Sequence, residues 1–129
     1  MPNTVPSPPD AQTSTRTMQA IVQHEYGGPE VLHLDERPIP TPEDDEVLVK
    51  VRAASVNAGD WHLMRGTPIL VRFMAGGLFR PTPTIGSDVA GTGDALGPDV
   101  SQFQPGDAVL GDLSTSGFGA FAEYVCVPE

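Results

Sequence analysis

The chain has 129 residues, which suits a single domain, and its apolar share of 39% supplies a modest core without indicating a membrane span. A formal net charge of −10 would repel phosphate backbones and anionic headgroups, so we expect neither nucleic acid nor a membrane as a partner. Cys126 is the only cysteine, which excludes an internal disulfide and a multi-cysteine zinc site and favours a cytoplasmic location.

The start of the chain carries no folding signal. Residues 1–17 are predicted to be a disordered tail, because they are rich in proline and hydroxyl side chains and hold no apolar run. A transit peptide is the alternative, but the single Arg16 supplies too little positive charge. The domain is therefore expected to span residues 18–129.

Two strands are predicted next, over residues 18–26 and 31–36, with a glycine-glycine-proline turn at residues 27–29 that pairs them as a hairpin. Three prolines in the following ten residues exclude a helix there. The 14 glycines and 14 prolines of the whole chain likewise favour turns and short strands over long helices.

The strongest strand is predicted over residues 46–56. Four side chains share one face, which we expect to be the core face: Val47, Val49, Val51 and Ala53. Asn57 then marks the end of the strand, and Asp60 is predicted to cap a short helical turn over residues 61–65. Gly66 stands where a helix stops.

An apolar segment follows over residues 67–84, interrupted by Gly76 and Gly77. It is too short and too interrupted to cross a bilayer. One interpretation is a helical excursion packed on the β domain. The other is a lid that faces a ligand cleft and hinges at the two glycines.

The last third of the chain returns to strand patterns. Strands are predicted from residue 85 to a break at Gly97, over residues 108–110 after a proline-glycine-aspartate turn, and from residue 117 to Pro128. The total is six or seven strands with little helix, which is typical of a barrel or sandwich.

Several residues invite a functional interpretation that their surroundings do not support. The Gly91-Thr92-Gly93 run lacks the third glycine and the helix of a dinucleotide fingerprint, so we expect strand bends. The histidines at positions 24, 33 and 62 lack metal-ligand spacing, and only His62, in the turn after a strand, is a candidate for proton transfer. Cys126 is expected to be a buried, unreactive thiol, and Asp88 and Asp107 to bond turn backbone.

Four phrases occur in a specific order and spacing: PEVLHLDERPIP, EVLVKVRAASVNAGDWHLMRG, IGSDVAGTGDALGPDVSQFQPGDAVLGD and GAFAEYVCVPE. Over residues 18–129 they resemble the N-terminal GroES-like domain of the medium-chain dehydrogenase/reductase superfamily. The resemblance implies a mainly β fold, a partly open GroES-like barrel with short helical turns. Within the superfamily it is most similar to the zinc-free quinone oxidoreductase, or zeta-crystallin-like, branch.

The branch assignment depends on two positions. Zinc-dependent relatives place a cysteine where this chain has Asn57, and a glycine-histidine-glutamate phrase where it has Gly86-Ser87-Asp88. Asparagine and serine are poor substitutes for thiolate and imidazole, so the resemblance implies no metal site and no catalytic zinc.

The resemblance also implies roles for individual residues. Cofactor-side contacts are carried over to Asn57, Ala58 and Gly59, and substrate-side contacts to Trp61 and His62. The residues carried over or proposed as catalytic are Asn57, Asp60, His62 and Ser87.

The chemistry implied by the family is hydride transfer from a nicotinamide cofactor, commonly NADPH (NADP or NAD), to a quinone or an α,β-unsaturated carbonyl. Negative charge on the substrate oxygen then needs donors, and Asn57, His62 and Ser87 are available. The family's Rossmann domain, which binds the pyrophosphate, is absent from these 129 residues, so we expect little or no turnover from the chain alone. It would be an excised piece, a truncated product or half of a split enzyme, and the full-length protein is expected to be a homodimer.

Two other readings remain open. The chain could be a non-catalytic GroES-like binding or assembly module that uses the apolar segment Pro68 to Phe79 as a partner surface. A zinc enzyme with substituted ligands is the more distant alternative.

Overall fold

The computed structural model describes residues 16–129, so most of the predicted tail lies outside the described residues. The strands are β1 (Thr17–Val22), β2 (His33–Pro38), β3 (Glu46–Ser55), β4 (Asp88–Leu96), β5 (Ala108–Asp112) and β6 (Tyr124–Pro128). The helical elements are the 3-10 turns η1 (Pro29–Val31) and η2 (Ile69–Phe73) and the α-helix α2 (Ala58–Arg65).

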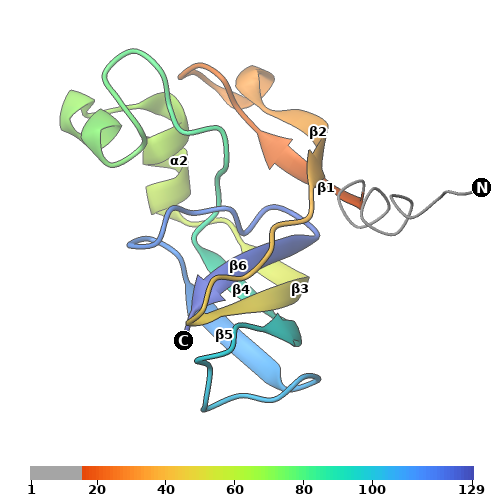
Figure 1. Cartoon of the computed structure of the whole chain (residues 1–129). Helices are drawn as coiled ribbons and strands as arrows, with labels where there is room; N and C mark the ends of the chain where they lie inside the picture. The colour runs from red at the N-terminus through yellow and green to blue at the C-terminus, as the bar shows by residue number, and fades with distance from the viewer. Residues whose placement is uncertain (1–15) are drawn as a thin grey trace, which may run out of the picture.

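The strands form two antiparallel sheets (Figure 1). One is the β1–β2 hairpin, and the other has the order β5-β4-β3-β6. Backbone bonds join the hairpin region to the segments that precede β6 and β4: the Ile21 N–H donates to the Phe121 carbonyl at 2.8 Å, and the Gln23 N–H to the Pro83 carbonyl at 2.9 Å. The predicted mainly β, partly open barrel and its opening hairpin are confirmed.

The boundaries of the hairpin strands differ from the prediction. The first strand ends at Val22 rather than at residue 26, because the next backbone N–H, that of Gln23, turns away to Pro83. The second strand begins at His33, since Pro29 opens a 3-10 turn that includes Val31. A proline at the first helical position is preorganised for such a turn.

The predicted core face of β3 is correct for its first half only. Val47 and Val49 are buried, but Leu48 is buried as well and Ala53 is exposed. The register with β4 shifts between Leu48 and Val49 and again between Val51 and Ala53. The first shift leaves Asp94 of β4 unpaired, and the second leaves Arg52 of β3 unpaired. The extra residue in β3 changes the face of the side chains that follow it, which is why simple alternation fails at Ala53.

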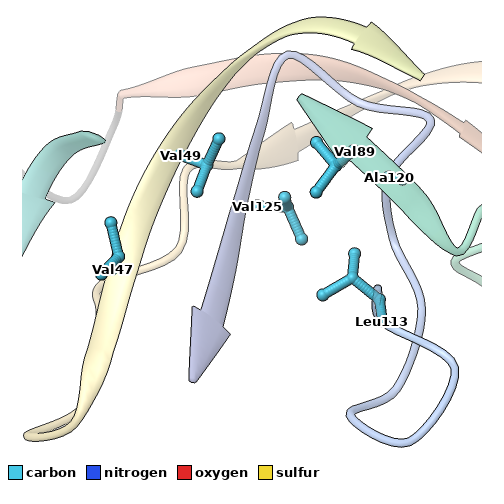
Figure 2. Close-up of a cluster of buried hydrophobic side chains, with 6 residues drawn as sticks. All are labelled: Val47, Val49, Val89, Leu113, Ala120 and Val125. Carbon is cyan, nitrogen blue, oxygen red and sulfur yellow. The ribbon is translucent and has the colours of Figure 1, made fainter. Parts of the chain in front are cut away.

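The core lies between the large sheet and the chain that connects β5 to β6. Figure 2 shows its buried members gathered from three strands and that connection: Val47, Val49, Val89, Leu113, Ala120 and Val125. The final strand begins at Tyr124 rather than at residue 117, because a turn with positive φ angles occupies residues 117–119. Gly91-Thr92-Gly93 lies inside β4, which confirms the expected strand conformation.

Helix α2 and the 3-10 turn η2 lie together at one end of the large sheet, at the upper left of Figure 1. Of the helical elements in the described part of the chain, none is long and apolar enough to span a bilayer. The predicted site residues all fall at this end, between the end of β3 and the start of β4.

Candidate functional site

The turn from β3 into α2 is organised by Asn57 and Asp60. Asn57 is the N-cap residue, with an extended backbone (φ −111°, ψ 165°), so the prediction that Asp60 caps the helix is wrong by three positions. Asp60 instead occupies the third helical position and accepts the Asn57 backbone N–H at 2.8 Å, as the acidic residue of a capping box does. Gly66 ends the helix in the left-handed region at φ 70°, as predicted.

The Asp60 carboxylate links α2 to the segment that precedes β4. One oxygen binds the Asn57 N–H, and the other accepts the Ser87 hydroxyl at 3.4 Å. The side chain is only 6% exposed. Because both oxygens have partners inside the protein, Asp60 is arranged to hold Asn57 and Ser87 in place rather than to meet a ligand.

Asn57 also bonds across the sheet. Its side-chain Nδ2 donates to Asp88 Oδ2 at 2.5 Å, and the Ser55 hydroxyl donates to the same oxygen at 3.2 Å. Ser55 and Asp88 are direct partners in the β3–β4 ladder, which brings the three side chains together. Asp88 is thus not the turn residue that the sequence predicted, whereas Asp107 does accept a turn N–H, from Gln104 at 2.8 Å.

The two ring nitrogens of His62 have different surroundings. Its Nδ1 lies 2.8 Å from the Thr67 carbonyl oxygen, which can only accept, so Nδ1 carries a hydrogen. In the neutral ring Nε2 is then the nitrogen that can take up a proton. The neighbouring Trp61 is 47% exposed and is covered by the Arg65 guanidinium at 4.8 Å from the ring centre.

An open pocket of about 630 Å³ lies beside α2. It is lined by Gly59, His62, Leu63, Pro68, Val71, Met74, Ser87, Ser114 and Phe118. The lining is mostly apolar with a few polar groups, which is the composition typical of small-molecule sites.

Of the predicted site residues, the pocket brings together Gly59, His62 and Ser87. Asn57, Asp60 and Ala58 lie beside it in the capping turn and do not line it, and neither does Trp61. The backbone at Gly59 borders open space, since a Cβ built there would meet nothing within 4 Å. A flat ring could therefore approach the first turn of α2 closely.

Sequence reasoning missed Ser114 and Phe118, which reach the pocket from the connection between β5 and β6. Ser114 also bonds Asp112: hydrogen bonds from its backbone N–H, at 2.9 Å, and then from its hydroxyl lower the pKa of the Asp112 carboxyl. The glycines on both sides of Phe118 were the only sequence signal of an unusual turn there.

Arg72 fastens the apolar segment at two points. Its Nε donates to the Gly66 carbonyl at 3.0 Å and its Nη1 to the Leu78 carbonyl at 2.8 Å, while its guanidinium lies 4.5 Å from the Tyr26 ring centre. The Tyr26 hydroxyl donates to the Gly77 carbonyl at 2.5 Å. The segment thus combines parts of both interpretations: it contains the 3-10 turn η2, and Pro68, Val71 and Met74 face the pocket, while Tyr26 bonds the second glycine of the pair.

The two remaining predictions concern a metal site and the reactivity of the Cys126 thiol. Within residues 16–129, no three His, Cys, Asp or Glu side chains gather as a metal site would require. Cys126 is half-buried, and burial, then the negative charges of Glu46 and Glu43, raise its pKa to about 11.

The family described as "Alcohol dehydrogenase GroES-like domain" matches residues 43–129. This chain belongs to that family. The GroES-like domain is 39% identical to the human quinone oxidoreductase over 118 residues, which are 91% of this chain and 33% of that protein. It is 38% identical over 120 residues to a chloroplastic quinone-oxidoreductase homolog of Spinacia oleracea, covering 90% of this chain and 34% of the relative.

The chain also matches solved structures of quinone oxidoreductases. The GroES-like domain matches the quinone oxidoreductase from Coxiella burnetii with a TM-score of 0.76 and 31% identity, over 88% of this chain and 35% of that one. It matches the Escherichia coli quinone oxidoreductase complexed with NADPH with a TM-score of 0.71 and 27% identity, over 85% and 31% of the two chains. The resemblance to the quinone oxidoreductase branch is confirmed, and the chain spans about one third of the length of these relatives.

Proposed function

We propose that this chain is the substrate-side domain of a zinc-independent, NAD(P)H-dependent oxidoreductase that reduces quinones or α,β-unsaturated carbonyls. The observation that carries the proposal is an apolar pocket that is lined by both His62 and Ser87 and borders the open backbone of Gly59. Its relatives are quinone oxidoreductases, and the Escherichia coli protein was solved with NADPH. Reduction of a conjugated carbonyl needs donors for one oxygen, not a metal ion.

The residues present fit the nicotinamide end of such a cofactor. Asn57, Ala58 and Gly59 form the exposed first turn of α2, and the space beside Gly59 is open. The pyrophosphate end finds no counterpart in residues 16–129, because every strand pair is antiparallel and no βαβ unit with a glycine-rich loop occurs. We therefore propose that this chain by itself binds the cofactor weakly and has little or no turnover.

The proposed role of the side chains in this domain is to donate a proton to the substrate oxygen and to bind the resulting hydroxyl. The reduced cofactor, when bound, supplies a hydride, and the substrate oxygen needs one proton to complete the reduction. His62 is the proposed donor in its doubly protonated form: Thr67 keeps the Nδ1 hydrogen, Nε2 gives its proton to the substrate oxygen, and the neutral ring then takes a proton back from water. Ser87, whose hydroxyl donates to Asp60, turns its oxygen lone pairs to the substrate hydroxyl that results.

In this proposal Asn57 and Asp60 do not contact the substrate and serve to position other residues. Asp60 fixes the backbone of Asn57 and the hydroxyl of Ser87, and Asp88 fixes the Asn57 amide. Trp61 lies outside the pocket on the exposed side of α2, so a substrate contact from it would require a ligand that extends beyond the pocket. Homodimerisation and a cytoplasmic location remain parts of the proposal.

A second function is favoured by one observation. The apolar segment exposes six large side chains, between 38% and 83% exposed: Ile69, Leu70, Phe73, Met74, Leu78 and Phe79. A stand-alone binding or assembly module would use such a surface to contact a protein partner.

Titration with NADPH, followed by fluorescence, separates the two functions when combined with the mass of the chain in solution. The oxidoreductase proposal expects saturable binding and NADPH-dependent reduction of a quinone once the remainder of an enzyme is supplied. A defined oligomer that is indifferent to NADPH, with no quinone reduction in any form, would favour the module instead. Stoichiometric zinc in the purified protein would contradict zinc independence.

A further inference from the structure

Phe118 has a backbone conformation that its side chain disfavours. The connection between β5 and β6 contains three successive residues with positive φ: Gly117 at 103°, Phe118 at 64° and Gly119 at 117°. Glycine adopts this region freely, but a residue with a Cβ is strained there, and a bulky aromatic residue is an outlier. The sequence therefore accepts a cost in free energy to keep phenylalanine between two glycines.

Hydrogen bonds hold this turn against the pocket. The Phe118 N–H donates to the Leu113 carbonyl at 3.1 Å, and the Gly119 N–H to the Gly86 carbonyl at 3.0 Å. The Leu113 N–H in turn donates to the Ser87 carbonyl at 2.6 Å. Strained backbone persists where its surroundings determine it in this way, and such residues gather at ligand sites.

Phe118 also lies where three pockets meet. It lines the pocket that contains His62 and Ser87. It also lines a narrow, nearly filled gap beside the buried Gln23, and a second open pocket, of about 710 Å³, that Phe121 and Cys126 line as well. A half-buried aromatic side chain at this junction separates spaces that a smaller residue would join.

We infer that Phe118 is a specificity-determining residue: it forms a wall that limits how large a ring system the pocket beside His62 accepts. The inference rests on the proposed function, since it concerns the same pocket. The fastened turn fixes the position of the wall, and the strain is the cost of directing an aromatic side chain there.

The strain is tested independently of any ligand. Phe118→Ala removes the ring and keeps the strained Cβ, whereas Phe118→Gly removes both. We expect the glycine variant to melt about 4 °C or more above the alanine variant, the shift typical of one relieved left-handed residue in a domain of this size. Equal melting temperatures would show that the position is unstrained and would overturn the inference.

The role of Phe118 as a wall is tested by measuring two dissociation constants of the 129-residue chain. One is for duroquinone, which has one ring, and the other is for 9,10-anthraquinone-2-sulfonate, which has three. Neither probe has an unsubstituted quinone carbon to which the Cys126 thiol could add. In Phe118→Ala we expect the ratio of the two dissociation constants to move at least about tenfold in favour of the larger quinone. Phe118→Leu, which keeps the bulk, should change it little.

Phe121→Ala is the matched control, because Phe121 lies three residues away and lines the pocket beside Cys126 but not the pocket beside His62. An unchanged ratio in Phe118→Ala, or an equal change in Phe121→Ala, overturns the role of Phe118 while the wild-type chain still binds quinones. Absence of quinone binding by the wild-type chain instead overturns the proposed function, and the specificity role with it.

Discussion

The side-chain amide of Asn57 donates a hydrogen bond to the carboxylate of Asp88 at 2.5 Å, across the paired ends of β3 and β4. This bond directs the amide nitrogen toward the sheet and its oxygen toward Ser55, whose hydroxyl lies 3.4 Å away. The N-cap of α2 is therefore attached to the large sheet by a side chain as well as by the backbone. Asp88 acts on the site by orienting Asn57.

Replacing Asp88 with alanine should destabilise the domain by about 1 kcal/mol, because the Asn57 amide and the Ser55 hydroxyl both lose their acceptor. Urea denaturation measures the change. Asp94→Ala on the same strand is the control, since Asp94 is exposed and should cost less than about 0.5 kcal/mol. Equal effects of the two substitutions would show that the Asn57–Asp88 bond contributes nothing.

Asp60→Ala should cost more, about 2 kcal/mol, since it removes a buried carboxylate that binds both the Asn57 N–H and the Ser87 hydroxyl. Asp60→Asn keeps one acceptor oxygen and should fall between alanine and wild type. Chemical denaturation followed by far-ultraviolet circular dichroism gives both values. An alanine variant as stable as wild type would refute the capping role.

His62→Gln should lower the rate of quinone reduction by about a hundredfold in an active enzyme that contains this chain, because it removes the proposed proton donor. The folded structure should be unchanged, which circular dichroism checks. His24→Gln is the control, since His24 is exposed and lines none of the pockets described above. A His62→Gln enzyme with wild-type rates would remove His62 from the mechanism.

Cys126 should react slowly with thiol reagents in the folded protein. Burial, then Glu46 and Glu43, raise its pKa from 9.0 to about 11, so at pH 8 the thiolate fraction is roughly 100-fold smaller than in the unfolded chain. The rate of reaction with dithiobis(nitrobenzoate) at pH 8, with and without urea, measures the ratio. Equal rates in both states would contradict the assignment.

The same pKa predicts how stability depends on pH. The folded state binds the Cys126 proton more tightly than the unfolded state, so this contribution to stability is complete below about pH 9 and is lost as the pH rises to about 11. Cys126→Ser should remove this part of the slope. Denaturation midpoints of both proteins between pH 8 and pH 11 provide the comparison, and parallel profiles would exclude a role for the thiol.

Local sequence patterns predicted the elements well where one physical effect dominated. Alternating valines indicated β3, and the spacing from Asn57 to Gly66 indicated a short helix with a glycine stop. The helix start was misplaced because both Asn57 and Asp60 are good caps, and only the hydrogen bond between them shows which one stands outside the helix. The face of Ala53 was misjudged because a bulge at Arg52 precedes it in β3.

The sequence by itself determined the fold class, the family and the segment that holds the candidate site, because strand periodicity, turn residues and phrase order are properties of the chain alone. Only the tertiary structure decided which side chains meet. Strand register places Asp88 against Asn57, and backbone bonds carry Phe118 from the connection between β5 and β6 to the pocket of His62 and Ser87. Contacts between residues 30 or more positions apart depend on register and loop closure, which no local pattern encodes.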